Sequence, residues 1–301
     1  MSTRQTADEE ALTELFARSS ELQAPSSLRD DLHQRLFGSP ATARTGDRIG
    51  RYVLDQQLGA GGMGVVYRAH DPELDRSIAI KLVRIRDSDS DAAVDRRRSR
   101  MMREAQAMAQ LRHPNVVTIH DVGLHNGHVF IAMDLVEGIT LKQWLRAGTR
   151  HWREIVRVFL AAGAGLYAAH QAGLIHRDFK PSNVLIDSHQ QVHVIDFGLV
   201  KHGESATLTP EPTSSGSDEQ TGPSAQEITR AGSVMGTVAY MSPEQLAKAP
   251  LDARSDQFSF CVTLFEALYG NRPYAGSTPQ HLSYNLHTGA MVDPTKRVGP
   301  R

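Results

Sequence analysis

Cysteine is almost missing from this sequence, and so is any long apolar run. Cys261 is the single cysteine in 301 residues, so the chain cannot form an internal disulfide bond. It stands in an apolar run, where we expect a buried structural thiol. No apolar run reaches the roughly 18 residues that a membrane-spanning helix needs, and the polar start MSTRQTADEE lacks the apolar core of a signal peptide. We therefore expect a cytoplasmic protein with no membrane span in this chain.

A surplus of charge of either sign is missing too. The 33 Lys and Arg residues and 34 Asp and Glu residues leave a net charge of -1, so we expect neither nucleic acid nor an anionic membrane as the main partner. The histidines are scattered, and His125 and His128 flank an Asn-Gly turn, so we expect no metal site there. With 40% hydrophobic residues, the chain has enough apolar material for a globular core.

Polar side chains concentrate between His176 and Gly198, in the stretch HRDFKPSNVLIDSHQQVHVIDFG. Asp178, Lys180 and Asn183 fall within six positions, and Asp196 follows an alternating run typical of a strand that leads into a turn. His176-Arg177-Asp178 alone, or Asp196-Phe197-Gly198 alone, fits a surface loop. Both together, in this order, belong to a known catalytic set, and polar groups at the end of a strand are placed for chemistry.

A glycine-rich stretch lies near the start of the strand pattern, from Leu58 to Gly64. A dinucleotide-binding fold would continue into a helix after these glycines. Here Val65 to Arg68 continue as β-type sequence, so we expect the glycines to close a hairpin. Glycine is favoured there because backbone amides can then approach phosphate oxygens without Cβ atoms in the way.

The next strand, Ile78 to Val83, carries a single lysine, Lys81. A buried ammonium needs an anion, although a solvated lysine on an edge strand is the alternative. We expect the anion to be Glu104, because it shares the apolar face of a helix predicted at about 92–111. The arginines at 96–103 fit a solvated face, or else a phosphate-sensing one.

The remaining pattern predicts a hairpin (116–119 with 128–133) and helices at about 141–146, 152–172, 258–269 and 280–286. Residues 1–50 read as an N-terminal helical extension and linker, which docks internally or binds a partner. The composition at about 202–233 predicts a disordered loop insertion.

Taken in chain order, the glycine-rich stretch, Lys81, Glu104 and the motifs around Asp178 and Asp196 resemble those of the eukaryotic-type (Hanks-type) serine/threonine protein kinases of the bacterial branch. The resemblance covers the chain from about Arg51 onward and includes Ser242-Pro243-Glu244. It implies an α+β, two-lobed fold, with a small antiparallel N-lobe sheet and helix C (about 51–134) and a mainly helical C-lobe (about 138–301). Family members continue through further helices that supply a partner arginine for Glu244. We therefore expect an incomplete C-lobe, a Glu244 without an obvious partner and an apolar helix at 258–269 that is only partly covered.

The resemblance also implies roles for the site residues. Asp178 would orient or deprotonate the attacking hydroxyl, Lys180 would touch the γ-phosphate, and Lys81, paired with Glu104, would hold the α- and β-phosphates of ATP. Asn183 and Asp196 would bind Mg²⁺, or Mn²⁺ in its place. The nucleotide would contact Leu58, Gly59, Ala60, Gly61, Gly62, Met63, Gly64, Val66, Ala79, Lys81, Met133, Asp134, Val136 and Leu185. A stack of Met108, Ile119, His176 and Phe197 would link the lobes.

Regulation follows from the same resemblance. Arg177 would grip a phosphate on the loop, with Thr229 and Ser233 as the acceptors, and self-association would allow autophosphorylation in trans. Thr237 resembles members that act on serine and threonine, so the expected partners are protein substrates with Ser/Thr hydroxyls. Two other readings stay open, a non-catalytic kinase-fold nucleotide-binding or scaffold protein and a small-molecule kinase of related fold.

Overall fold

The computed structural model of this protein describes residues 43–61, 64–83, 91–198, 238–276 and 278–294. The chain divides into two compact units, 1–42 and 43–301, and all described residues belong to the second. Gly62, Met63, Thr229, Ser233, Thr237 and the expected loop insertion at 202–233 lie outside the described residues.

An antiparallel sheet forms the first half of the described unit, as the sequence predicted. Its strands are β1 (Arg48–Ile49), β2 (Tyr52–Gly61), β3 (Gly64–Asp71), β4 (Arg76–Val83), β5 (Ile119–His125) and β6 (His128–Asp134), in the order β1-β2-β3-β4-β6-β5. The β5–β6 turn is formed by Asn126 and Gly127, both at positive φ, which suits an Asn-Gly hairpin.

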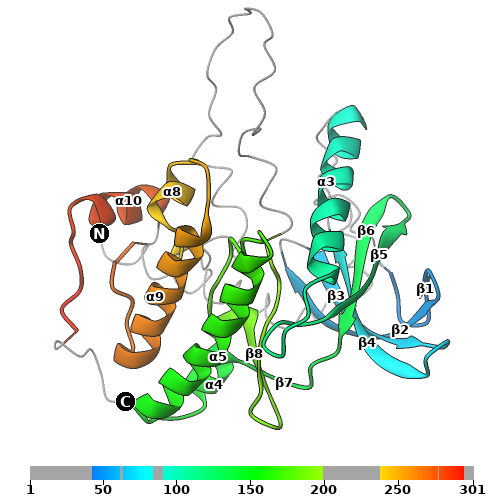
Figure 1. The fold of residues 1–301 in the computed structure, drawn as a ribbon, viewed down its shortest axis with the longest axis horizontal. Coiled ribbons are helices and arrows are strands. Elements are labelled where there is room, and N and C mark those ends of the chain that lie inside the picture. Colours follow the sequence, from blue (N-terminus) through cyan, green and yellow to red (C-terminus); the bar gives the residue numbers. More distant parts are fainter. Residues whose placement is uncertain (1–42, 62–63, 84–90, 199–237, 277, 295–301) are drawn as a thin grey trace, which may run out of the picture. The chain divides into compact units, whose positions relative to one another are not determined.

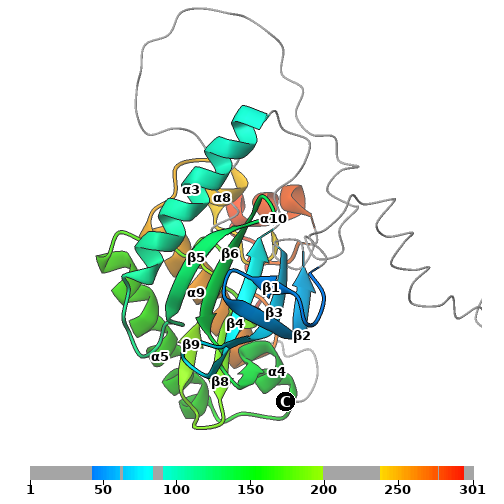
Figure 2. The same ribbon diagram turned by 90° about the vertical axis from the view of Figure 1, so that its right-hand side faces the viewer.

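A single long helix, α3 (Asp91–Ala109), accompanies this sheet. It runs across β5 and β6 (Figures 1 and 2). Met101, Ala105 and Met108 are buried on its inner face, as their spacing predicted. Glu104 lies on the same helix and is partly buried.

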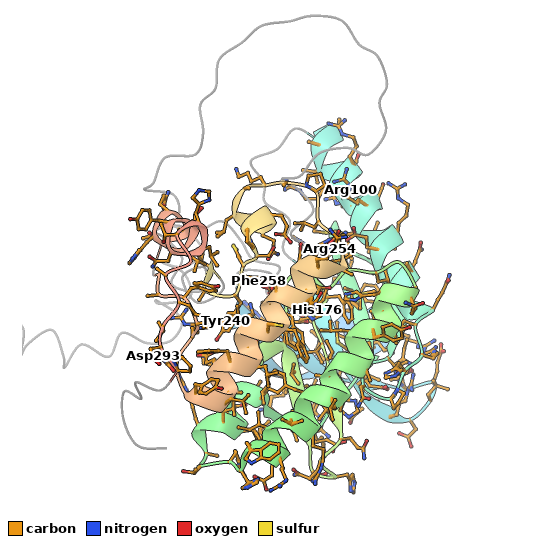
Figure 3. The ribbon with its side chains drawn as sticks, turned by 60° about the vertical axis from the view of Figure 1, so that its left-hand side comes forward. Arg100, His176, Tyr240, Arg254, Phe258 and Asp293 are labelled. Atoms are coloured by element: carbon orange, nitrogen blue, oxygen red, sulfur yellow. The ribbon has the colours of Figure 1, made fainter. Side chains whose placement is uncertain are left out.

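The second half is mainly helical. It contains a small sheet of β7 (Gly138–Thr140), β8 (Val184–Asp187) and β9 (Val192–Val194), and the helices α4 (Leu141–Arg146), α5 (Trp152–Gln171), α8 (Pro243–Leu246), α9 (Ala253–Tyr269) and α10 (Pro279–His287). Capping boxes begin α4 and α5, Thr140 with Gln143 and His151 with Glu154. α5 and α9 lie side by side (Figures 1 and 3) and meet through Phe159 and Phe260, whose rings are 5.3 Å apart and edge to face.

The two halves join where the segment after α3 rests on α5. A Cβ atom at Gly165 of α5 would lie 2.5 Å from the Asn115 carbonyl oxygen, so only glycine permits this approach. The Asn115 carbonyl accepts from the Val194 backbone amide at 2.9 Å, and its side chain donates to the Val192 carbonyl at 2.8 Å. The strand that leads to Asp196 is therefore tied to both halves.

The outer face of α9 corrects one prediction. Cys261 was expected to be buried, but it is exposed. It points away from Ser255, Ser259 and Thr263, which form the buried face of the helix. Tyr269 is also 40% exposed, so within the described residues this apolar helix is only partly covered, as expected. No helix in the described part of the chain is both long and apolar enough to cross a membrane.

Candidate active site

The segment from His176 to Asn183 brings Asp178, Lys180 and Asn183 together. Lys180 Nζ lies 2.8 Å from Asp178 Oδ2. The Asn183 side-chain amide donates to the same oxygen at 3.2 Å and to the Asp178 carbonyl at 2.9 Å. Asp178 and Asn183 are buried. A carboxylate in a fixed direction, with a cation beside it, is suited to accept a hydrogen bond from a hydroxyl that attacks a phosphoryl group.

Asp256 of α9 anchors the loop from His176 to Asn183. The Asp256 carboxylate accepts from the backbone amides of His176 and Arg177, each at 2.7 Å, and contacts His170 Nε2 at 2.8 Å. Asp256 is 1% exposed. Asp256 does not cap the helix, because the N-cap of α9 is Asp252. Asp256 instead fixes the backbone on which Asp178 sits.

His176 connects the loop to the Asp196 turn. Its Nε2 lies 2.9 Å from the Ile195 carbonyl, and its Nδ1 accepts from the Asp178 backbone amide at 3.2 Å. Burial lowers the pKa of His176, although the nearby charge of Asp256 opposes the shift. A neutral ring with the proton on Nε2 satisfies both hydrogen bonds.

The turn at Asp196, Phe197 and Gly198 packs against this histidine. The Phe197 ring lies 4.6 Å from the His176 ring, and the Gly198 amide donates to the His176 carbonyl at 2.7 Å. Met108 and Ile119, the other members of the predicted stack, are buried in the same core cluster as Phe197. Asp196 and Arg177 both have left-handed backbone, with φ of 58° and 62°, a conformation that costs a non-glycine residue about 1–3 kcal/mol and is often found at functional sites.

The ion pairs differ from the prediction. Lys81 was expected to pair with Glu104, but Lys81 Nζ lies 2.7 Å from Asp196 Oδ1, and Glu104 Oε1 lies 3.2 Å from Arg177 Nη1. The physical premise holds, since the buried ammonium meets an anion. The partner is different because Asp196 and Arg177 also lie in this region, so two acidic and two basic side chains form the two pairs.

A cavity of about 330 Å³ lies beside the Glu104–Arg177 pair. Arg100 and Arg103 of α3 line it together with Arg177, Glu104, Phe197 and Gly198. Figure 3 labels Arg100 on α3. Three guanidinium groups around one cavity form a site suited to an anion. The arginines of α3 therefore differ in their surroundings. Arg100 and Arg103 line the cavity, whereas Arg98 pairs with Asp95 at 3.0 Å.

Four of the predicted nucleotide residues lie on one face of the sheet. Lys81 is the cross-strand partner of Val66, and Ala79 is the partner of Met133. Directly opposite residues share a face, as do positions two apart on one strand, so these four side chains project to the same side. Leu58 is 49% exposed, and Leu185 on β8 is partly buried.

The glycines and the segment after β6 complete this region. Gly59 and Ala60 on β2 pair with Val66 and Val65 on β3, and Gly61 pairs with Gly64. A Cβ atom at Gly64, which has a φ of 139°, would overlap the Leu82 carbonyl, so glycine is required there. Asp134 ends β6 and is exposed, and Val136 lies in the connection to β7.

The segment around Ser242-Pro243-Glu244 is tied to α9. Glu244 was expected to lack an obvious partner, but its carboxylate accepts from the Ser255 hydroxyl at 2.8 Å. Tyr240 donates to Glu266 at 2.5 Å, and burial followed by the Glu266 charge raises its pKa. The Gln245 side chain donates to the Arg177 carbonyl at 2.7 Å. Figure 3 labels Tyr240. The contact of Gln245 with Arg177 was missed by sequence reasoning, because no local residue pattern marks it.

Asn183 and Asp196, the predicted magnesium ligands, carry side-chain oxygen atoms of the kind that Mg²⁺ prefers. Asn183 commits its amide nitrogen to Asp178, which leaves its side-chain oxygen as the ligand atom, and Asp196 supplies a carboxylate. No cluster of three or more His, Cys, Asp or Glu side chains in the described ranges could hold a metal ion. Mg²⁺ bound together with nucleotide phosphates and water needs only one or two carboxylate or amide ligands.

This fold and site define a protein kinase, and the chain belongs to that family. The protein kinase domain family matches residues 52–296. Among curated relatives, the chain is 35% identical over 257 residues to the serine/threonine-protein kinase PrkC of Bacillus subtilis, covering 85% of this chain and 36% of PrkC. It is 36% identical over 236 residues to the serine/threonine-protein kinase PknL of Mycobacterium tuberculosis, covering 78% of this chain and 53% of PknL.

Solved structures agree on the two-lobed fold. The crystal structure of the M. tuberculosis PknI kinase domain matches with a TM-score of 0.57 at 27% identity, covering 78% of this chain and 79% of that one. This chain spans only 36% to 53% of the length of the curated relatives named above.

Proposed function

We propose that this chain is an ATP-dependent protein kinase that transfers the γ-phosphoryl group of MgATP to serine and threonine hydroxyls of proteins. The observation that carries the proposal is the buried Asp178 carboxylate, held by Asn183 and paired with Lys180 at 2.8 Å. The names of its curated relatives, serine/threonine-protein kinases, support the same acceptor class.

Asp178 orients the acceptor hydroxyl and takes its proton as the bond from that oxygen to the γ-phosphorus forms and the bond from the γ-phosphorus to the bridging oxygen of ADP, the leaving group, breaks. Lys180 lies beside it and offsets negative charge on the transferred phosphoryl group. In this role the short Lys180–Asp178 contact keeps the general base and the cation side by side, so a single acceptor hydroxyl can contact both side chains.

Asn183 and Asp196 would hold Mg²⁺, which when bound neutralises charge on the phosphate oxygens. Lys81 would bind the α- and β-phosphates under the glycine loop. The adenine would lie between Leu58, Val66 and Ala79 on one side and Leu185 on the other. Met133 would lie behind it and the backbone of Asp134 and Val136 at its edge.

Regulation would use the two ion pairs as alternatives. A phosphate on Thr229 or Ser233 would compete for Arg177 and for the arginine-lined cavity. Glu104, released from Arg177, would then become available to Lys81, and Lys81 would leave Asp196 free for Mg²⁺. Self-association would let one copy phosphorylate another. The cytoplasmic location expected from sequence stays a prediction.

Transfer of radiolabelled phosphate from MgATP to generic protein substrates tests the function. We expect Asp178→Asn to lower the rate at least about 100-fold, because a general base contributes about 10²–10⁴-fold. Asp187→Asn is the matched control, since Asp187 lies in the β8–β9 turn, where its carboxylate accepts from the amides of His189 and Gln191 and contacts His193 Nε2 at 3.3 Å. Nucleotide binding without transfer by the wild-type protein would favour the non-catalytic alternative.

A further inference from the structure

β5 carries one extra residue where it passes the end of β6, and that residue is His120. Ile119 pairs with Met133 and Asp121 pairs with Ala132. One step along β6 is therefore matched by two steps along β5. Such a bulge interrupts the alternation of side chains between the sheet faces and redirects the side chain of the extra residue.

The bulge aims the His120 ring at the last residue of β6. His120 Nε2 lies 2.6 Å from Asp134 Oδ1, and the two side chains are 17% and 47% exposed. An ionised carboxylate only accepts, so the ring donates from Nε2. The Asp134 backbone amide also donates to the Thr118 carbonyl, at 2.9 Å. The segment at the start of β5 thus holds Asp134 at two points, one on the backbone and one on the side chain.

Asp134 is the residue at which the sheet ends and the connection to β7 begins. Its amide is fixed on one side of the Cα atom and its carboxylate on the other. With these two substituents of the Cα atom held, the position of the third, the carbonyl carbon, is held as well. The place from which the Asp134 carbonyl projects therefore depends on His120.

We propose that His120 is a positioning residue for the nucleotide base: by holding the Asp134 side chain, it keeps the Asp134 carbonyl directed at the 6-amino group of adenine. This inference rests on the proposed function, in which the Asp134 backbone meets the edge of the base. Adenine presents a donor at position 6 and guanine an acceptor. A fixed carbonyl would face the guanine oxygen acceptor to acceptor and reject it, whereas a carbonyl free to turn loses this discrimination.

The neighbouring residue supplies a matched control. Asp121 Oδ2 accepts from the Tyr52 hydroxyl at 3.0 Å, and Asp121 Oδ1 accepts from the Val122 amide at 2.8 Å. Burial and then the hydrogen bond to Asp121 raise the pKa of Tyr52 to about 12, so its hydroxyl stays protonated and donates. Tyr52→Phe removes a side-chain hydrogen bond from the same strand without touching Asp134.

The test compares MgATP and MgGTP as ligands and substrates. For His120→Ala we expect ATP affinity to fall by about 3- to 10-fold, the size of one hydrogen bond between neutral groups, here the Asp134 carbonyl and the 6-amino group. The preference for ATP over GTP should fall by a similar factor, while kcat at saturating ATP changes less than about twofold. His120→Gln, whose amide nitrogen can reach the same place, should recover most of the preference. Tyr52→Phe should leave the preference unchanged.

A double-mutant cycle with Asp134→Ala isolates the contact. Asp134→Ala should reproduce the effect of His120→Ala, and the double variant should add little more. If His120→Ala does not fold, Asp134→Ala carries the same test from the exposed side of the pair. A lowered melting temperature with an unchanged ATP-to-GTP ratio would overturn the role of His120 alone. If the wild-type protein binds neither nucleotide, the proposed function fails with it.

Discussion

The loop from His176 to Asn183 and the junction beside α3, where Lys81, Asp196, Glu104 and Arg177 form ion pairs, are held in different ways. The loop rests on backbone hydrogen bonds to Asp256, which is 1% exposed, and these leave its shape no alternative. At the junction, Lys81, Asp196, Glu104 and Arg177 are joined by side-chain ion pairs, with exposures from 9% to 29%. Buried backbone contacts fix a geometry, whereas partly exposed ion pairs can exchange partners at low cost. The fold therefore builds one half of the site rigidly and leaves the other half adjustable.

Removal of Asp256 should break the rigid half. Asp256→Ala leaves the buried amides of His176 and Arg177 without their acceptor, and we expect the free energy of unfolding to fall by about 3–5 kcal/mol. Urea denaturation measures this. The control is Asp252→Ala at the start of the same helix, where loss of an exposed N-cap should cost only about 1 kcal/mol. Equal losses for the two variants would mean that Asp256 is no more than a cap.

A change at Lys81 should affect the adjustable half in the opposite manner. Lys81→Met removes the charge for the phosphates, and we expect phosphoryl transfer to fall at least about 100-fold. The free energy of unfolding should change by less than about 1 kcal/mol, because the Asp196 carboxylate that loses its partner is 29% exposed and can be hydrated. Lys142→Met, on the exposed surface of α4, is the control. A large loss of stability in Lys81→Met would place Lys81 in the rigid half.

Loss of the phosphate acceptors should sharpen the comparison further. In a Thr229→Ala/Ser233→Ala variant, no phosphate at these two positions would compete with Glu104 for Arg177, and we expect activity about tenfold below that of the autophosphorylated wild type, a typical coupling energy. Mass spectrometry should detect phosphate at these positions in the active wild-type protein. Unchanged activity in the double variant would mean that the Arg177–Glu104 pair is not regulated by phosphate at these two positions.

The same contrast explains what sequence alone could predict. Asp178, Lys180 and Asn183 lie within one short turn, so their meeting follows from local spacing. The limits of α4 and α5 were predictable because capping residues and a regular apolar period mark them.

Partner choice could not be read from the sequence. Glu104 faces Arg177 instead of Lys81 because several charges converge from distant segments, and no local pattern ranks them. The exposure of Cys261 was missed for a related reason. Between residues 258 and 269, apolar side chains occupy most sides of α9 and the buried face includes Ser259 and Thr263, so its periodicity does not tell which side the rest of the protein covers.

The smallest expected effect lies where the two halves meet, at Gly165 of α5. Gly165→Ala would place a Cβ atom 2.5 Å from the Asn115 carbonyl oxygen, and overpacking of about 1–3 kcal/mol should exceed the helix-propensity gain of about 1 kcal/mol. Gly163→Ala, two residues earlier, would meet only the Phe260 ring at 3.5 Å, so it should stabilise the protein slightly. Thermal unfolding of both variants measures the difference. Asn115 also holds the strand that leads to Asp196, so of the two variants only Gly165→Ala should lower activity as well. Equal activity in the two variants would show that the contact between Gly165 and Asn115 transmits no strain to the site.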